Sequence, residues 1–207
     1  MTRKTTLFTG ALLAGALVLT GCSDDSVASH MDSMETGSAE STGTSASEDA
    51  AFNDADVTFA QGMIPHHEQA IEMAQMTQGR AQDSRVLDLA SRIEAAQQPE
   101  IEALTGWLEE WGVEDSGTGG MDHGGVDHGG GMMSEEDMNA LMAASGAEFD
   151  RLFLEQMIEH HTGAVDMAVT ESAEGDNPNA IAMAETIRDT QNAEIAEMKQ
   201  VLTELGG

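Results

Sequence analysis

The hydrophobic and polar positions divide the chain into an apolar start, a polar stretch and two longer mixed blocks. Leu7–Thr20 carries no charge, and residues 23–50 are rich in Ser, Thr, Gly, Asp and Glu. The two blocks that follow are rich in Ala, Glu, Gln, Met and Leu, a composition that favours helices. They are separated by residues 114–133, in which glycine dominates. The pattern predicts an all-α domain over residues 51–207.

The two blocks contain an internal repeat. Residues 56–112 and 150–206 align without a gap at an offset of 94 residues, and seventeen of the 57 aligned pairs are identical. A repeat of this length indicates two copies of one structural unit. The identical pairs include Asp56/Asp150, Met63/Met157, His66/His160, His67/His161, Met73/Met167, Gln97/Gln191 and Glu100/Glu194.

Each copy predicts a helical hairpin. Asn53 or Asp54 is a suitable N-cap in the first copy and Asn177 in the second, and Gly79 marks the turn within the first copy. The apolar stripes of two hairpins must be buried against each other, and a four-helix bundle with a pseudo-two-fold axis achieves this. The expected long helices cover about 53–77, 83–111, 147–173 and 178–205, and a short extra helix runs from Ser134 to near Gly146.

The start of the chain has the features of a bacterial lipoprotein signal peptide. Its apolar run is fourteen residues long, follows two basic residues and ends in Leu-Thr-Gly-Cys, which resembles a lipobox. A run of this length suits a signal peptide better than a permanent membrane span, although an uncleaved anchor is the alternative. We expect residues 1–21 to be removed and Cys22 to carry the lipid. Residues 22–50 then form a flexible tether to the outer face of the membrane.

The charge and the single cysteine narrow the range of ligands. The formal net charge is −30, and it becomes −32 when Arg3 and Lys4 leave with the signal peptide. Such a field repels nucleic acid and anionic membrane surfaces and attracts cations, although acidity also serves solubility alone. If Cys22 is lipidated, no thiolate remains, so a soft metal must be bound by methionine sulfur.

The repeated segments FAQGMIPHHEQAIEMA and FLEQMIEHHTGAVDMA carry the candidate chemistry. On a helix of about 100° per residue, their shared His, Met and Ala side chains fall on one face about 120° wide. Two-fold symmetry would bring the two faces together in the core, with the two His-His pairs facing each other. The predicted metal ligands are Met63, His66, His67, Met73, Met157, His160, His161 and Met167.

The mixture of imidazole and thioether predicts the metal. Imidazole binds several transition metals, whereas thioether favours Cu(I) and its soft relatives. We therefore expect copper as Cu(I), with silver or zinc as alternatives. The same residues also suit a core without metal, but their retention in both copies favours metal binding.

The glycine-rich segment 114–133 contains similar side chains outside the predicted helices. Seven of the fourteen residues 117–130 are glycine, so we expect the segment to be disordered without metal. It supplies weaker ligand candidates, which are Met121, His123, His128, Met132 and Met133.

The doubled Met-Ile-x-His-His motif, followed by Ala and Met, resembles the family called domain of unknown function 305. The resemblance covers about residues 50–206. It implies a ferritin-like four-helix bundle of a secreted metal-binding protein, and the family includes copper-binding proteins of the CopM type. The ligands that it implies are the eight residues of the two motifs.

Three functions follow from these observations. The first is a non-enzymatic copper protein for buffering, tolerance or trafficking, which exchanges metal with another copper-handling protein. The second is a ferritin-like di-metal oxidoreductase, but its Glu-x-x-His motif is missing because Met or Ile stands three residues before each motif histidine. Nearby acids such as Glu68 and Glu159 are expected on the solvated face. The third is a stress or interaction module with structural histidines.

Overall fold

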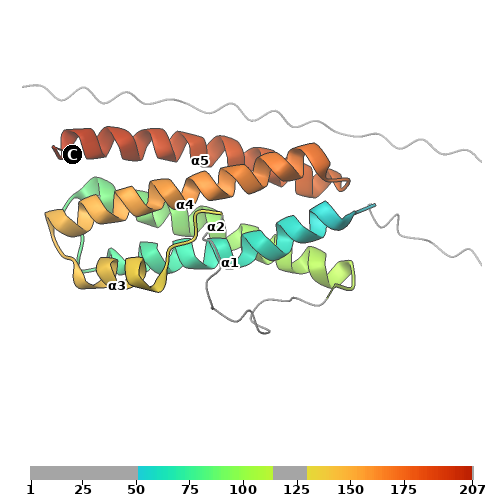
Figure 1. The fold of residues 1–207 in the computed structure, drawn as a ribbon, viewed down its shortest axis with the longest axis horizontal. Coiled ribbons are helices and arrows are strands. Elements are labelled where there is room, and N and C mark those ends of the chain that lie inside the picture. The colour runs from blue at the N-terminus through green and yellow to red at the C-terminus, as the bar shows by residue number, and fades with distance from the viewer. Residues whose placement is uncertain (1–50, 114–129, 207) are drawn as a thin grey trace, which may run out of the picture. The chain divides into compact units, whose positions relative to one another are not determined.

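The computed structural model describes residues 51–113 and 130–206, which belong to one compact unit, residues 46–207. These residues form five helices and no strand (Figure 1). The fold is the predicted all-α, ferritin-like four-helix bundle of two repeated hairpins. Its helices are α1 (Asp54–Met76), α2 (Ser84–Glu110), α3 (Glu135–Ala143), α4 (Ala147–Glu174) and α5 (Pro178–Glu204).

The predicted caps place the helix starts correctly. Asn53 accepts hydrogen bonds from the backbone of Ala55 and Asp56, and Asn177 does the same for α5 with Pro178 in the first position. Ser134 and Asp137 form a capping box at the start of α3. Each cap satisfies backbone N–H groups that a helix start leaves without an intrahelical partner. The short helix ends at Ala143, earlier than the expected Gly146.

The bundle is assembled from two antiparallel hairpins, α1 with α2 and α4 with α5. The two copies meet mainly through α1 and α4, which run in opposite directions in Figure 1, and the short α3 lies against both. Among the described residues, no helix is long and apolar enough to cross a membrane.

Two buried aspartates join the copies at opposite ends of the bundle. Asp56 in α1 accepts hydrogen bonds from the backbone N–H groups of Asp176 and Asn177, at 3.1 and 2.9 Å, just before α5. Asp150 in α4 accepts them from the N–H groups of Gln82 and Asp83, at 3.0 and 2.8 Å, just before α2. These paired contacts show that the pseudo-two-fold symmetry of the sequence extends to the packing.

Candidate metal centre

A layer of polar side chains crosses the bundle between two apolar clusters. The first cluster lies where α1 ends and α4 begins, and the second lies where α1 begins and the later part of α4 passes. On α1, for example, the paired histidines stand between Ile64 of the second cluster and Ala70 of the first. The eight side chains of this histidine layer are His66, His67, Gln97, Glu100, His160, His161, Gln191 and Glu194.

The four histidines lie in the interior, each at most 1% exposed. The rings of His66 and His160 are 3.8 Å apart between centroids and tilted by 42°. This confirms the prediction that the two histidine pairs face one another, because His66 belongs to α1 and His160 to α4. The contact lies where the two copies meet, so each copy supplies half of the layer.

The second histidine of each pair contacts a carboxylate of its own hairpin. His67 Nε2 lies 2.8 Å from Glu100 Oε2, and His161 Nε2 lies 2.8 Å from Glu194 Oε2. The two contacts are related by the repeat. The carboxylates are partly shielded, with side-chain exposures of 18% for Glu100 and 15% for Glu194.

Five imidazole nitrogens in the layer are buried without a hydrogen-bond partner. They are Nδ1 of all four histidines and Nε2 of His160. The side-chain oxygens of Gln97 and Gln191 are also buried without a partner. Burying polar atoms without partners costs free energy, and a ligand bound among these donors and acceptors would offset that cost.

Burial keeps two of the imidazoles neutral. It lowers the pKa of His66 to about 3, although the contact with Gly130 acts in the opposite direction. Burial also lowers the pKa of His160 well below 6.5, and the neighbouring histidines add to this effect. A neutral imidazole has a free lone pair for a metal ion, and no proton competes for it at neutral pH.

The predicted methionine ligands flank the histidine layer on both sides. Met63, Met73 and Met157 are fully buried, whereas Met167 is partly exposed. Met63 and Met167 belong with the second apolar cluster, and Met73 and Met157 with the first. One thioether from each copy therefore stands on either side of the layer.

Residues 130–133, which we call the strap, pass over the layer between α1 and α4. His66 Nε2 donates a hydrogen bond of 2.8 Å to the carbonyl of Gly130. A Cβ atom added to Gly163 would lie 1.7 Å from that carbonyl oxygen, so α4 needs a glycine there. Gln69 holds Met133 through two hydrogen bonds, donating to its carbonyl at 2.9 Å and accepting from its N–H at 2.7 Å.

The strap corrects part of the expectation for the glycine-rich segment. Predicted disorder is wrong for residues 130–133, because hydrogen bonds and close backbone packing hold them. Met133 is buried in the first apolar cluster and Met132 is partly buried. The other weak ligand candidates, Met121, His123 and His128, lie outside the described residues, as do Cys22 and the predicted signal peptide and tether.

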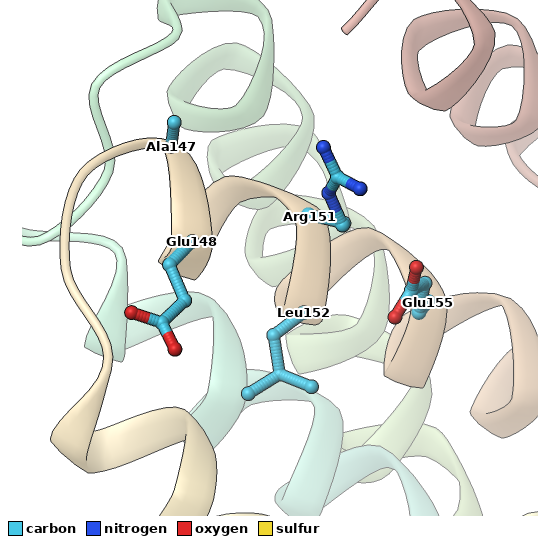
Figure 2. A pocket seen from close by; sticks show the side chains of 5 residues that line it. All are labelled: Ala147, Glu148, Arg151, Leu152 and Glu155. Atoms are coloured by element: carbon cyan, nitrogen blue, oxygen red, sulfur yellow. The ribbon is translucent and has the colours of Figure 1, made fainter. Parts of the chain in front are cut away.

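Other acidic groups and pockets stand apart from the layer. As expected, Glu68 and Glu159 are exposed. Within residues 51–113 and 130–206, the histidine layer included, no three His, Cys, Asp or Glu side chains converge as a metal ion requires. Figure 2 shows a surface pocket on the first turns of α4, lined by Ala147, Glu148, Arg151, Leu152 and Glu155, none of which is a predicted ligand.

Sequence reasoning did not assign a role to the glutamates and glutamines of the layer. The repeat contains these residues as the identical pairs Glu100/Glu194 and Gln97/Gln191. This identity is the signal in the sequence that could have pointed to a shared role. Their helical spacing of three residues places each glutamine next to a glutamate on one face. His67 and Glu100 are 33 residues apart in the sequence, so their contact becomes visible only when α1 and α2 pack together as a hairpin.

The fold and the buried layer define a class of four-helix bundles with histidines at the centre of an internal repeat. The family model "Domain of unknown function (DUF305)" matches residues 56–202. The chain therefore belongs to this family, as its motif predicts.

Solved structures of the family share the fold. A family protein from Streptomyces coelicolor, described as secreted, is 30% identical, with a TM-score of 0.67 over 74% of this chain and 93% of that one. CopM bound to Cu(I) is 32% identical, with a TM-score of 0.61 over 73% of this chain and 98% of that one. CopM is also known bound to Cu(II) and to silver.

A curated relative matches over a shorter stretch. The uncharacterized protein L153 of Acanthamoeba polyphaga mimivirus is 42% identical over 60 residues. These residues are 29% of this chain and 39% of the viral protein. The match thus spans less than half of either protein.

Proposed function

We propose that this protein is an extracytoplasmic, lipid-anchored metal-binding protein that takes up Cu(I), or the similar ion Ag(I), through its histidine layer and the flanking thioethers. The observation that carries the proposal is the set of five unpartnered imidazole nitrogens inside the bundle. Two of the imidazoles, those of His66 and His160, are kept neutral by burial. CopM, about a third identical, binds copper and silver on the same fold.

The donor set supports a soft ion. Four thioethers flank four imidazoles, and thioether sulfur favours Cu(I) over harder ions. Carboxylates contribute little, because Glu100 and Glu194 are already engaged by histidines. The proposed role is copper buffering, tolerance or trafficking at the cell surface, without catalysis. The location at the cell surface is proposed from the predicted signal peptide and the predicted lipid at Cys22.

The test is an anaerobic titration of the purified full chain with Cu(I) against a competing chelator, beside Zn(II) and Fe(II). Tight Cu(I) binding supports the proposal. Preferential binding of Fe(II) with oxidation activity would favour a di-metal oxidoreductase. An absence of binding for all three ions would leave the histidines structural.

Variants separate thioether from imidazole. Changing Met63, Met73, Met157 and Met167 together to leucine keeps a similar volume and should preserve the bundle. Affinity for Cu(I) should fall at least about 100-fold because soft donors are lost, while Zn(II) binding should change little. Met76→Leu with Met198→Leu makes the same change at two buried methionines outside the predicted set. Should the fourfold variant and this control bind Cu(I) equally, the core methionines are packing residues.

Histidine variants complete the test. Changing His66, His67, His160 and His161 to glutamine should weaken binding of both Cu(I) and Zn(II), since both ions need imidazole. Circular dichroism of each variant checks that the helices remain. Unchanged Cu(I) affinity in a folded histidine variant would place the copper site outside the histidine layer.

A further inference from the structure

The contacts of the two glutamates of the histidine layer favour one tautomer of each neighbouring imidazole. A carboxylate accepts hydrogen bonds, so Nε2 of His67 donates to Glu100, and Nε2 of His161 donates to Glu194. Nδ1 of each of these rings is buried without a partner. The tautomer with hydrogen on Nε2 therefore satisfies the contact with the carboxylate and leaves the lone pair of Nδ1 free.

The backbone makes the same selection at a third histidine. Nε2 of His66 donates to the carbonyl of Gly130, and Nδ1 of His66 is buried without a partner. Three of the four rings thus have an acceptor on Nε2 and a free lone pair on Nδ1. His160 differs, because neither of its nitrogens has a partner.

We propose that Glu100 and Glu194 are positioning residues that make His67 and His161 bind the metal ion through Nδ1. This inference rests on the proposed function of the histidine layer. A carboxylate that accepts from one ring nitrogen fixes the tautomer and orientation of the ring and makes the other nitrogen more basic. The glutamates are thus held outside the set of ligands, although they are the acids nearest to it.

The repeat and the burial of the contacts support this role. The His67–Glu100 and His161–Glu194 contacts occur at equivalent positions of the two copies. The same contact therefore forms twice and is not particular to the packing of one copy. The glutamate side chains are less than one-fifth exposed, which limits competition from water. Hydrogen bonds to an ionised group are also stronger than those between neutral groups.

The first experiment uses the metal-free full chain labelled with ¹⁵N at histidine. Long-range ¹H–¹⁵N spectra show for each ring which nitrogen carries the proton, and single His→Gln variants assign the signals. We expect the Nε2–H tautomer at His67 and His161. The Nδ1–H tautomer at these two rings would overturn the inference even if the protein binds copper tightly.

Variants test whether the glutamates cause this state. Glu100→Leu with Glu194→Leu removes both acceptors and should give mixed tautomers and a metal affinity about 10–100-fold lower. Glu100→Gln with Glu194→Gln keeps an acceptor oxygen, so it should restore the tautomer and most of the affinity. Glu102→Leu with Glu185→Leu, at exposed sites on α2 and α5, is the matched control. An unchanged tautomer in the leucine variant would refute the positioning role.

Addition of Ag(I), which is diamagnetic, tests the bound state in the same spectra. We expect the Nδ1 signals of His67 and His161 to shift and to couple to silver, while Nε2 keeps its proton. Binding through Nε2 would overturn the inference and leave the proposed function intact. If no histidine signal responds to Ag(I) or Cu(I), the proposed function fails, and the metal-facing role of Nδ1 fails with it.

Discussion

Asp56 and Asp150 each hold the start of a helix that belongs to the other copy of the repeat. Asp56 binds the backbone just before α5, and Asp150 binds the backbone just before α2. Both side chains are at most 1% exposed. Each hairpin caps its own second helix, through Asp83 or Asn177, and the aspartate of the other copy holds the backbone of that cap residue and of the residue before it.

Removing one of these two aspartates should destabilise the whole bundle. Asp150→Ala leaves two backbone N–H groups without an acceptor, and we expect the free energy of unfolding to fall by about 2 kcal/mol. Urea denaturation followed by circular dichroism measures the change. Asp54→Ala, at an exposed position in the first turn of α1, is the control. Equal stability of the two variants would show that the contacts between Asp150 and the backbone before α2 contribute nothing.

Replacing His160 should stabilise the metal-free protein. Both of its ring nitrogens are buried without a partner, so His160→Leu removes two unsatisfied polar atoms from the core. We expect the free energy of unfolding to rise by about 1 kcal/mol while metal affinity falls. His161→Leu is the comparison, because it breaks the contact with Glu194 and should gain less. If His160→Leu is less stable than the parent, the packing of the His160 ring against His66 stabilises the protein by more than is gained from removing two unpartnered nitrogens.

Glu171 should make stability fall as the pH rises from about 5 to about 8. Burial, and then the neighbouring Asp56 carboxylate, raise its pKa from 4.5 to about 8. The folded state therefore holds a proton that the unfolded state has lost. Its stabilising contribution is complete below pH 4.5 and disappears as the pH passes 8, at up to about 1.4 kcal/mol per pH unit.

The variant Glu171→Gln isolates this effect. It should have a flatter dependence of the unfolding free energy on pH between 5 and 8 and be more stable than the parent at pH 9. Glu174→Gln makes the same chemical change at an exposed position on α4. Denaturation at pH 5, 7 and 9 compares the three proteins, and parallel curves for the parent and Glu171→Gln would contradict the assignment.

Gly163→Ala should lift the strap from α4. The new Cβ atom would overlap the carbonyl of Gly130, so His66 would lose its hydrogen-bond acceptor. We expect faster hydrogen exchange in residues 130–134 and faster uptake of Ag(I). Gly106→Ala is the matched control, because nothing lies within 4 Å of its added Cβ and it should gain about 0.5–1 kcal/mol from helix propensity. Identical exchange rates in the two variants would rule out contact between the strap and Gly163.

The helices and their arrangement were predictable because the signals are local or repeated. Asn53 and Asn177 mark helix starts through short-range capping, and the repeat requires two equivalent hairpins. The spacing of Met63, His66 and His67 placed these side chains on one buried face. The facing of His66 and His160 then follows from two-fold symmetry.

The remaining features depend on contacts between distant segments. The partner of His67 lies 33 residues away, and the contact of His66 with Gly130 comes from a segment whose composition indicates disorder. Glu171 has no counterpart in the first copy, where Thr77 occupies the matching position, so the repeat gave no hint of a buried acid. Such features need the packed bundle, because they arise from burial and approach.

The position of the histidine layer midway along the bundle bears on the rate at which a metal ion could enter and leave it. All four imidazoles are buried from solvent. Under the proposed function, an ion would reach them only when the strap or the helices move apart, and the frequency of these openings would set how quickly copper enters and leaves, whatever the affinity of the site at equilibrium. A protein built in this way would hold its ion through brief changes in the surrounding copper concentration and respond only to lasting ones.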